Sequence, residues 1–137
     1  MLKWDDKYII GIPTIDRQHK RLVDIANEAS EILALPEHMD KYDDIISILN
    51  ELKEYTAFHF TTEEEIMKKL HYPKLFSHKV EHHDFVAKIN EVDLYKIDED
   101  QDAHLLQIIH FITDWIVSHI LEKDSHIASY YNTFKKQ

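Results

Sequence analysis

YDDIISILNELKEYTAFHFTTEEEIMKKL, residues 42–70, carries apolar residues at alternating steps of three and four along its length. Because an α-helix has 3.6 residues per turn, this spacing predicts one long helix whose apolar side chains share a face. Two positions on that face hold titratable residues, His59 and Glu63, which lie about one turn apart. The segment therefore predicts a helix that packs along one side and carries polar groups into the interior of the fold.

Three further segments repeat this periodicity, and the connections between the four segments are short. The repeats are Ile15, His19, Leu22, Ala26, Ala29 and Leu33; Leu75, His78, His82, Phe85, Ile89 and Val92; and Leu105, Ile108, Ile112, Trp115 and His119. The connections read PEHMD (36–40), HYP (71–73) and KIDEDQ (96–101). Short connections favour antiparallel neighbours, so we predict an all-α fold, an up-down-up-down antiparallel four-helix bundle. Thr14 and Asp40 are the predicted N-caps of the first two helices.

We expect the chain to form one domain with a short extension at each end. Residues 1–13 are predicted to form an N-terminal arm, residues from about 14 to 122 the bundle, and residues from about 125 to 137 a tail with a short C-terminal helix. A length of 137 residues and a hydrophobic content of 44% suit a single domain with a substantial core.

The composition excludes several classes of partner and site. The chain has 16 basic and 26 acidic residues, a net charge of 16 − 26 = −10, which repels nucleic acid and anionic lipid. The absence of cysteine excludes disulfides and thiolate metal ligands. No secretory signal is recognisable, and no segment is predicted to be long and apolar enough to span a bilayer. We therefore expect a soluble cytoplasmic protein.

Six polar residues occupy positions that the periodicity assigns to the core: His19, His59, Glu63, His78, His82 and His119. In HKVEHH (78–83) two histidines share a face, because four residues turn a helix by about 400°, whereas His83 lies about 100° away and is expected outside. Any one core histidine is most simply explained by a hydrogen bond to a neighbour. A buried polar group without a partner costs about 1–3 kcal/mol, so six together approach the stability of a whole domain. A metal ion removes this cost by accepting their lone pairs.

The number and type of these ligands limit the metal. Five imidazoles with carboxylates exceed the four ligands that zinc usually takes, and they suit two metal ions bridged by carboxylates. Calcium and magnesium prefer oxygen, so a nitrogen-rich site disfavours both. The residue types alone do not decide whether the metal is iron, copper, manganese or zinc. The Glu-x-x-His pairs of ferritin-like di-iron sites are not supported by the spacing here.

A second carboxylate, Asp124, follows His119 by five residues in HILEKD (119–124). Five residues turn a regular helix by about 500°, which leaves this carboxylate about 140° from the histidine. Taken alone, Asp124 is expected to be an exposed acid. A single π-turn at this point would bring residues i and i+5 onto the same face.

Six motifs, in order along nearly the whole chain, resemble those of the hemerythrin family in its single-domain bacterial form. They are WDDKYIIGI (4–12), IDRQH (15–19), HFTTEE (59–64), YP (72–73), HKVEH (78–82) and HILEKD (119–124). One HxxxE or HxxxH pair is a weak signal, whereas ligand positions correctly spaced over four helices are specific.

The resemblance implies a non-haem di-iron centre with an oxo or hydroxo bridge from solvent, and O2 as its ligand. By this analogy His78, His82 and His119 hold one iron, His19 and His59 hold the other, and Glu63 and Asp124 bridge the pair. The second iron then has one vacant position, where O2 binds in the family. Four apolar residues near the ligands are predicted to form an O2 pocket that excludes water, although core packing alone would also explain them: Leu22, Phe60, Trp115 and Ile120.

The predicted function is reversible O2 binding for oxygen carriage, storage or delivery. Two other classes stay open, a sensor of oxygen, redox state or iron, and an enzyme such as a di-iron oxidase, a peroxidase or a nitric oxide-handling protein. We expect no enzyme, because no spare acid, base or substrate pocket is evident. A purely structural metal site would not require seven ligands. We expect a monomer, since no long apolar stripe is left on the outside.

Overall fold

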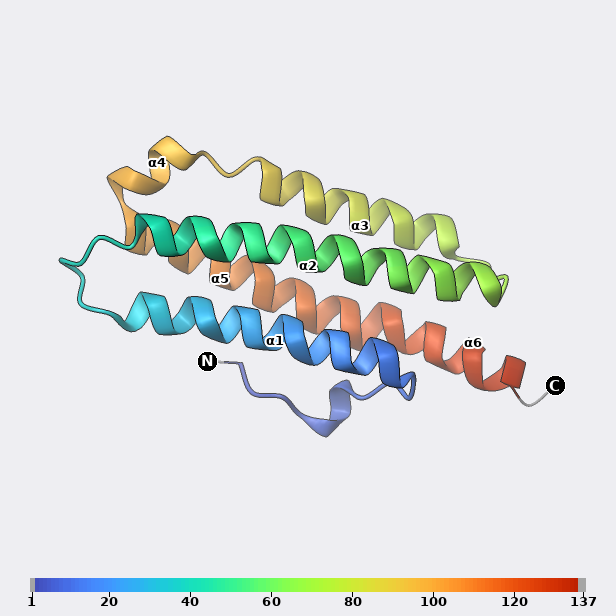
Figure 1. The fold of residues 1–137 in the computed structure, drawn as a ribbon. Helices are drawn as coiled ribbons and strands as arrows, with labels where there is room; N and C mark the ends of the chain where they lie inside the picture. The colour runs from blue at the N-terminus through green and yellow to red at the C-terminus, as the bar shows by residue number, and fades with distance from the viewer. Residues whose placement is uncertain (1, 136–137) are drawn as a thin grey trace.

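Four long helices form an antiparallel bundle, and consecutive helices run in opposite directions (Figure 1). The computed structural model describes residues 2–135, except for the side chains at positions 121, 134 and 135. The four helices are α1 (Pro13–Ala34), α2 (Tyr42–Lys69), α3 (Leu75–Asn90) and α5 (Gln101–Ser118). α1 packs on α2 and α5, and α2 packs on α3. Residues 2–135 contain no strand, so the predicted all-α bundle is confirmed.

The last helix continues beyond α5 without a break. A π-helical segment, η2 (His119–Asp124), follows α5 directly and leads into α6 (Ser125–Lys135). The predicted short C-terminal helix is therefore present, as an extension of the fourth bundle helix. The N-terminal arm contains one 3-10 turn, η1 (Asp6–Tyr8), which lies against η2.

The starts of the first two helices differ from the sequence prediction. α1 begins at Pro13, whose fixed φ suits the first helical position, so Thr14 lies inside the helix and its prediction as N-cap is wrong. The carboxylate of Asp16 instead accepts the N–H groups of Ile10 and Gly11, at 2.8 and 3.1 Å. At α2 the N-cap residue is Lys41, although the Asp40 carboxylate does accept a hydrogen bond from the N–H of the first helical residue, at 3.0 Å.

The connection between α3 and α5 is a packed element. It contains a short helix, α4 (Leu94–Glu99), where the sequence indicated a plain connection. The Asp93 carboxylate accepts hydrogen bonds from the N–H groups of Tyr95 and Lys96, which caps this helix. Ile97 is fully buried against the end of the bundle, so α4 closes the core at this end.

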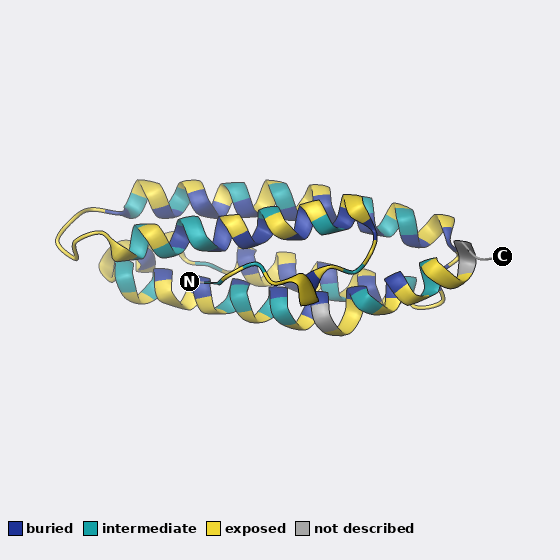
Figure 2. Cartoon of the chain, turned by 90° about the horizontal axis from the view of Figure 1, so that it is seen from below, coloured by how far each residue is buried: buried dark blue, intermediate teal, exposed yellow. Residues whose placement is uncertain are grey.

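Buried positions form a continuous stripe along the inner side of each helix (Figure 2). Most of them belong to one apolar cluster, and a smaller cluster of Ile12, Ile15, Met67, Leu70, Tyr72 and Ile127 lies where the arm meets α6. The helical run Gln101–Thr133 is long and apolar enough to cross a membrane by length and composition, contrary to the sequence prediction. Its apolar side chains at Leu105, Ile112 and Ile116 are buried in the bundle.

Lys41 is the unexpected member of the core, since its side chain is fully buried. Its ammonium donates to the Asp102 carboxylate at 2.7 Å and to the carbonyl of Leu33 at 3.3 Å. Its backbone N–H donates to the side-chain oxygen of Gln101 at 2.6 Å. This one residue, at the start of α2, therefore connects the end of α1 to the start of α5.

Replacing Lys41 with Met is expected to lower the free energy of unfolding by about 2 kcal/mol, because Met keeps the packed stem and removes the charged hydrogen bonds. Urea unfolding of the two proteins measures the difference. Lys68→Met, on the exposed side of α2, is the matched control and should stay within about 0.5 kcal/mol. Equal stability of the Lys41 and Lys68 variants would contradict the prediction.

Candidate metal centre

Three of the bundle helices, together with the π-helical segment that continues the fourth, contribute to one buried polar cluster. α1 supplies His19, α2 supplies His59 and Glu63, α3 supplies His78 and His82, and η2 supplies His119 and Asp124. Each of these residues is at most 3% exposed. The structure thus brings together all seven residues that the sequence singled out. His83 is exposed, as the helical geometry of HKVEHH predicted.

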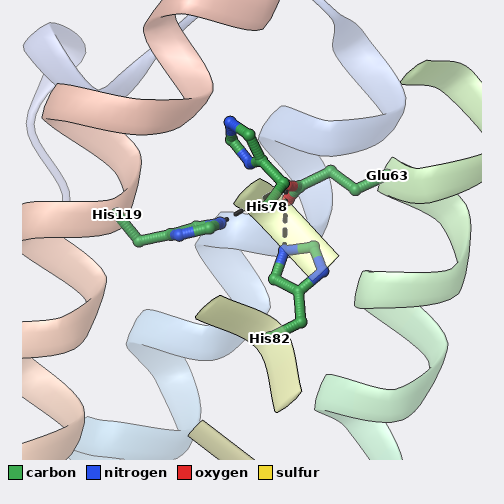
Figure 3. A group of neighbouring side chains, drawn as sticks. All are labelled: Glu63, His78, His82 and His119. Atoms are coloured by element: carbon green, nitrogen blue, oxygen red, sulfur yellow. Dashed lines mark hydrogen bonds and ion pairs between the residues drawn. The ribbon is translucent and has the colours of Figure 1, made fainter. Parts of the chain in front are cut away.

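The seven residues form two groups of potential metal ligands that share one carboxylate. In the three-histidine group, atoms of Glu63, His78, His82 and His119 lie within 4.8 Å of one another. Figure 3 shows the imidazoles of His82 and His119 directed at the Glu63 carboxylate, whose Oε1 lies 3.4 Å from His82 Nε2 and 3.3 Å from His119 Nε2. In the two-histidine group, His19, His59, Glu63 and Asp124 satisfy the same limit.

Each carboxylate directs one oxygen toward each group. Oε2 of Glu63 lies 2.6 Å from His59 Nε2 and 3.7 Å from His19 Nε2. Oδ2 of Asp124 lies 2.7 Å from His19 Nε2, whereas its Oδ1 lies 2.9 Å from His119 Nε2 and 4.0 Å from His78 Nδ1. This is the arrangement that two carboxylates need to bridge a pair of metal ions.

The π-helical geometry of η2 explains the position of Asp124. A π-turn pairs residues i and i+5, so the carboxylate lies on the same side of the helix as His119. Asp124 is fully buried, and the expectation from its spacing alone, an exposed acid, is wrong. From its spacing, Asp124 required a π-turn at HILEKD to join the cluster, and the structure has this turn.

The cluster is poorly satisfied by the protein itself. Among the described side chains, eight buried nitrogen and oxygen atoms have no partner in hydrogen-bond geometry, even where another atom of the cluster lies within 3 Å, and all eight belong to this cluster. They are His19 Nδ1 and Nε2, His59 Nε2, Glu63 Oε2, His78 Nδ1, His82 Nε2, and Asp124 Oδ1 and Oδ2. Uncompensated burial costs about 1–3 kcal/mol for each group. Cations coordinated by these lone pairs would satisfy them, so the residues fit a dinuclear metal centre.

Three residues outside the cluster hold the far sides of the imidazoles. The side-chain oxygen of Gln18 lies 2.7 Å from His59 Nδ1, and its amide nitrogen donates to Thr62 Oγ1 at 3.3 Å. Oε2 of Glu64 lies 3.0 Å from His82 Nδ1. Oε2 of Glu81 lies 3.8 Å from His119 Nδ1, and its other oxygen pairs with Lys123 at 3.3 Å. Sequence reasoning assigned no role here to Gln18, Glu64 or Glu81.

Proximity of the carboxylates changes the protonation of the histidines in the metal-free protein. Burial lowers the pKa of His19, but the adjacent Asp124 and Glu63 carboxylates outweigh burial and raise this pKa to about 9. Burial likewise lowers the pKa of His119, and the same two carboxylates raise it to about 10. Burial raises the pKa of Glu63, but His59, His119 and His19 lower it well below its usual range. Without metal, protons therefore neutralise part of the cluster.

Aromatic rings cover the three-histidine group. Phe60 stacks on His82 with ring centroids 4.0 Å apart, and Trp115 stacks on His119 at 4.3 Å. Outside them lies a surface groove of about 400 Å³ on the side of α3 and α5, lined by Phe85, Phe111, Trp115 and His119 among others. Trp115 thus covers one face of the His119 imidazole at a groove that both residues line.

The four residues of the predicted O2 pocket lie in one apolar region. Leu22, Phe60 and Ile120 are buried members of the main core cluster, and Trp115 is partly buried against it. Their role in holding O2 stays a prediction, because the same positions also serve core packing.

Comparisons with known proteins agree with the geometry. The family model described as "Hemerythrin HHE cation binding domain" matches residues 10–131. A bacteriohemerythrin of Clostridium acetobutylicum is 44% identical over 124 residues, 90% of this chain and 96% of that protein. A bacteriohemerythrin of Stenotrophomonas maltophilia is 30% identical over 93% of this chain and 80% of its own. A hemerythrin-like protein of Naegleria gruberi is 29% identical over 88% of this chain and 86% of its own.

Proposed function

Because this chain belongs to the hemerythrin family, we propose that its seven buried ligands hold two iron ions and that it binds O2 reversibly, for carriage, storage or delivery. The observation that carries this proposal is the pair of carboxylates, each with one oxygen toward either histidine group. Two ferrous ions, when bound, supply the electrons and the open coordination position that O2 binding uses. We propose a monomer in the cytoplasm as the working form.

The protein's own residues supply orientation, charge balance and exclusion of water. His78, His82 and His119 would hold one ion, and His19 and His59 the other. Two carboxylates against two divalent cations would leave a net positive centre in a buried site, and such a centre would attract anionic ligands. Phe60 and Trp115 block one approach of water to the imidazoles they cover, and water exclusion keeps O2 binding reversible.

An absorption spectrum recorded in three states tests the proposal. The protein is examined as isolated, after anaerobic reduction, and after readmission of air. We expect ligand-to-iron charge-transfer bands that bleach on reduction, return with O2 and bleach again under vacuum. Bands that return with air but persist under vacuum would still support a di-iron centre, but they would refute reversible O2 binding. Absence of iron from the purified protein would refute both.

Trp115→Ala is expected to accelerate loss of O2-binding protein to the oxidised form, on the order of tenfold, because it removes the ring that covers one face of His119 at the α3–α5 groove. The loss is followed by absorbance in air at constant pH and temperature. Trp115→Phe retains an aromatic ring, so its rate of loss should lie between the rates of the unchanged chain and of Trp115→Ala. Phe76→Ala removes an 82% exposed ring from α3 and is the matched control. Equal rates for Trp115→Ala and the control would contradict the prediction.

One observation favours a sensor as the second candidate. The N-terminal arm packs through η1 on η2, the segment that carries two of the ligands, and Tyr8 of η1 is buried there. Movement of His119 or Asp124 on O2 binding would therefore reach the arm. Limited proteolysis of the arm under air and under nitrogen tests this alternative. Cleavage of the arm at the same rate in both gases would contradict the sensor function.

A further inference from the structure

The two histidine groups differ in the charge of the residues behind them. The three-histidine group is backed by two carboxylates, those of Glu64 and Glu81, which face the outer nitrogens of His82 and His119. The two-histidine group is backed by the neutral amide of Gln18, which faces His59. The shared carboxylates do not produce this difference, because Glu63 and Asp124 each direct one oxygen toward either group.

Glu64 has the clearest geometry of the three. Its Oε2 lies 3.0 Å from His82 Nδ1, a charge-assisted hydrogen-bond distance that leaves the opposite nitrogen, Nε2, free for a metal. The opposite nitrogen lies 3.4 Å from Glu63 Oε1, inside the cluster. Glu64 is about a quarter exposed, so its carboxylate lies at the rim of the cluster while its partner is buried. Stacking of Phe60 on the same imidazole fixes the plane of the ring.

The two-histidine group lacks equivalent support. Gln18 lies 2.7 Å from His59 Nδ1 and fixes that ring, but an amide adds no negative charge. The outer nitrogen of the other histidine, His19 Nδ1, is buried and has no hydrogen-bond partner in the described structure. One position thus has three imidazoles with two charged supports, and the other has two imidazoles with one neutral support.

Outer carboxylates of this kind make an imidazole a better metal ligand, and their loss typically costs 10–100-fold in metal affinity. We propose that the two metal positions fill in sequence, the three-histidine position first, and that Glu64 is the positioning residue that sets this order. The inference rests on the proposed dinuclear centre and adds a defined one-metal state on the route to it. Glu81 is the weaker support, because it lies 3.8 Å from His119 Nδ1 and also pairs with Lys123 at 3.3 Å.

Anaerobic titration of the metal-free protein with Co²⁺, in competition with a chromophoric chelator, measures the order. We expect two resolved binding steps at least about tenfold apart. In NMR spectra the first equivalent should broaden the ring signals of His82 and His119 before those of His19 and His59. The readout is metal affinity, so it does not depend on O2 binding.

Two substitutions assign the steps to their positions. Glu64→Gln should weaken the first step about 10-fold or more and leave the second unchanged, whereas Glu64→Asp should recover part of the loss. Gln18→Leu should weaken the second step alone. Glu65→Gln removes the same charge from the neighbouring exposed position and should change neither step. Thermal unfolding of the metal-free variants checks that they fold alike.

The outcomes separate this inference from the proposed function. Binding of fewer than two Co²⁺ ions by the unchanged chain would count against the dinuclear centre itself. Two bound ions with unresolved steps, or with His19 and His59 broadened first, would overturn the filling order and leave the centre intact. The inference is also overturned if Glu64→Gln affects both steps equally or no more than Glu65→Gln does.

Discussion

A Glu63→Gln chain is expected to hold one iron ion where the unchanged chain holds two, and to lose reversible O2 uptake. Glu63 is fully buried and is the one residue that lies within 4.8 Å of the other ligand atoms in both groups. An amide offers a single acceptor oxygen, and its NH₂ group would face the imidazoles of His59 or His82. Loss of outer-sphere partners costs 10–100-fold in affinity, so loss of a shared direct ligand should weaken the second ion by more than about 100-fold.

Iron content per chain and the charge-transfer bands measure this effect. Glu54→Gln, an exposed position on the same helix, makes the same chemical change away from the cluster and should keep two ions. Circular dichroism of the metal-free variants shows whether the bundle has formed. A Glu63→Gln protein that holds two ions and takes up O2 normally would show that Glu63 is not a required ligand.

Lowering the pH from 8 to 6 is expected to weaken metal loading by about 10⁴-fold, taken over both ions. In the metal-free protein the pKa of His19 is about 9 and that of His119 about 10, so both imidazoles carry a proton over this range. Metal binds only the neutral imidazole, so loading displaces two protons, and each contributes about a factor of ten per pH unit. Chelator competition at a series of pH values gives the slope. A slope near zero would show that neither histidine is a ligand.

The stability of the metal-free protein should change in the opposite direction. Because the pKa values of His19 and His119 are raised above 6.5 on folding, their stabilisation is fully present below pH 6.5 and is lost as the pH rises through about 9 to 10. The pKa of Glu63 is lowered, so its stabilisation is present above its ordinary value of 4.5 and is lost as the pH falls. Urea unfolding should therefore show a maximum between about pH 4.5 and 6.5 for the metal-free chain, with a decline toward alkaline pH that bound metal reverses.

Helical periodicity was enough to predict the bundle and six of the seven clustered residues. Polar residues such as His59 and Glu63 interrupt an otherwise apolar face at steps of four, and this signal is local to one helix. The predicted side of His83 follows from the same geometry. These features depend on positions within one segment, so they are readable without knowledge of the partner helices.

Contacts between helices were beyond this kind of inference. Gln18 and Glu64 each lie next to a ligand in sequence, about 100° away on their own helix, and which imidazole they support depends on the neighbouring helix. The burial of Lys41 depends likewise on Asp102, 61 residues away. Asp124 entered the cluster only through a resemblance of motifs, because regular helical geometry places it elsewhere.

The π-helical segment η2 also affects the residues that follow it, because it changes which side of the last helix faces the bundle. One extra residue per turn rotates everything downstream by about 100° relative to an uninterrupted α-helix. Ile127, three residues beyond Asp124, is fully buried in the smaller apolar cluster with Met67 and Ile12. The same π-turn that brings the Asp124 carboxylate inward therefore also directs Ile127 of α6 into the smaller apolar cluster. Lengthening or shortening this helix by one residue would disturb the centre and its closure together.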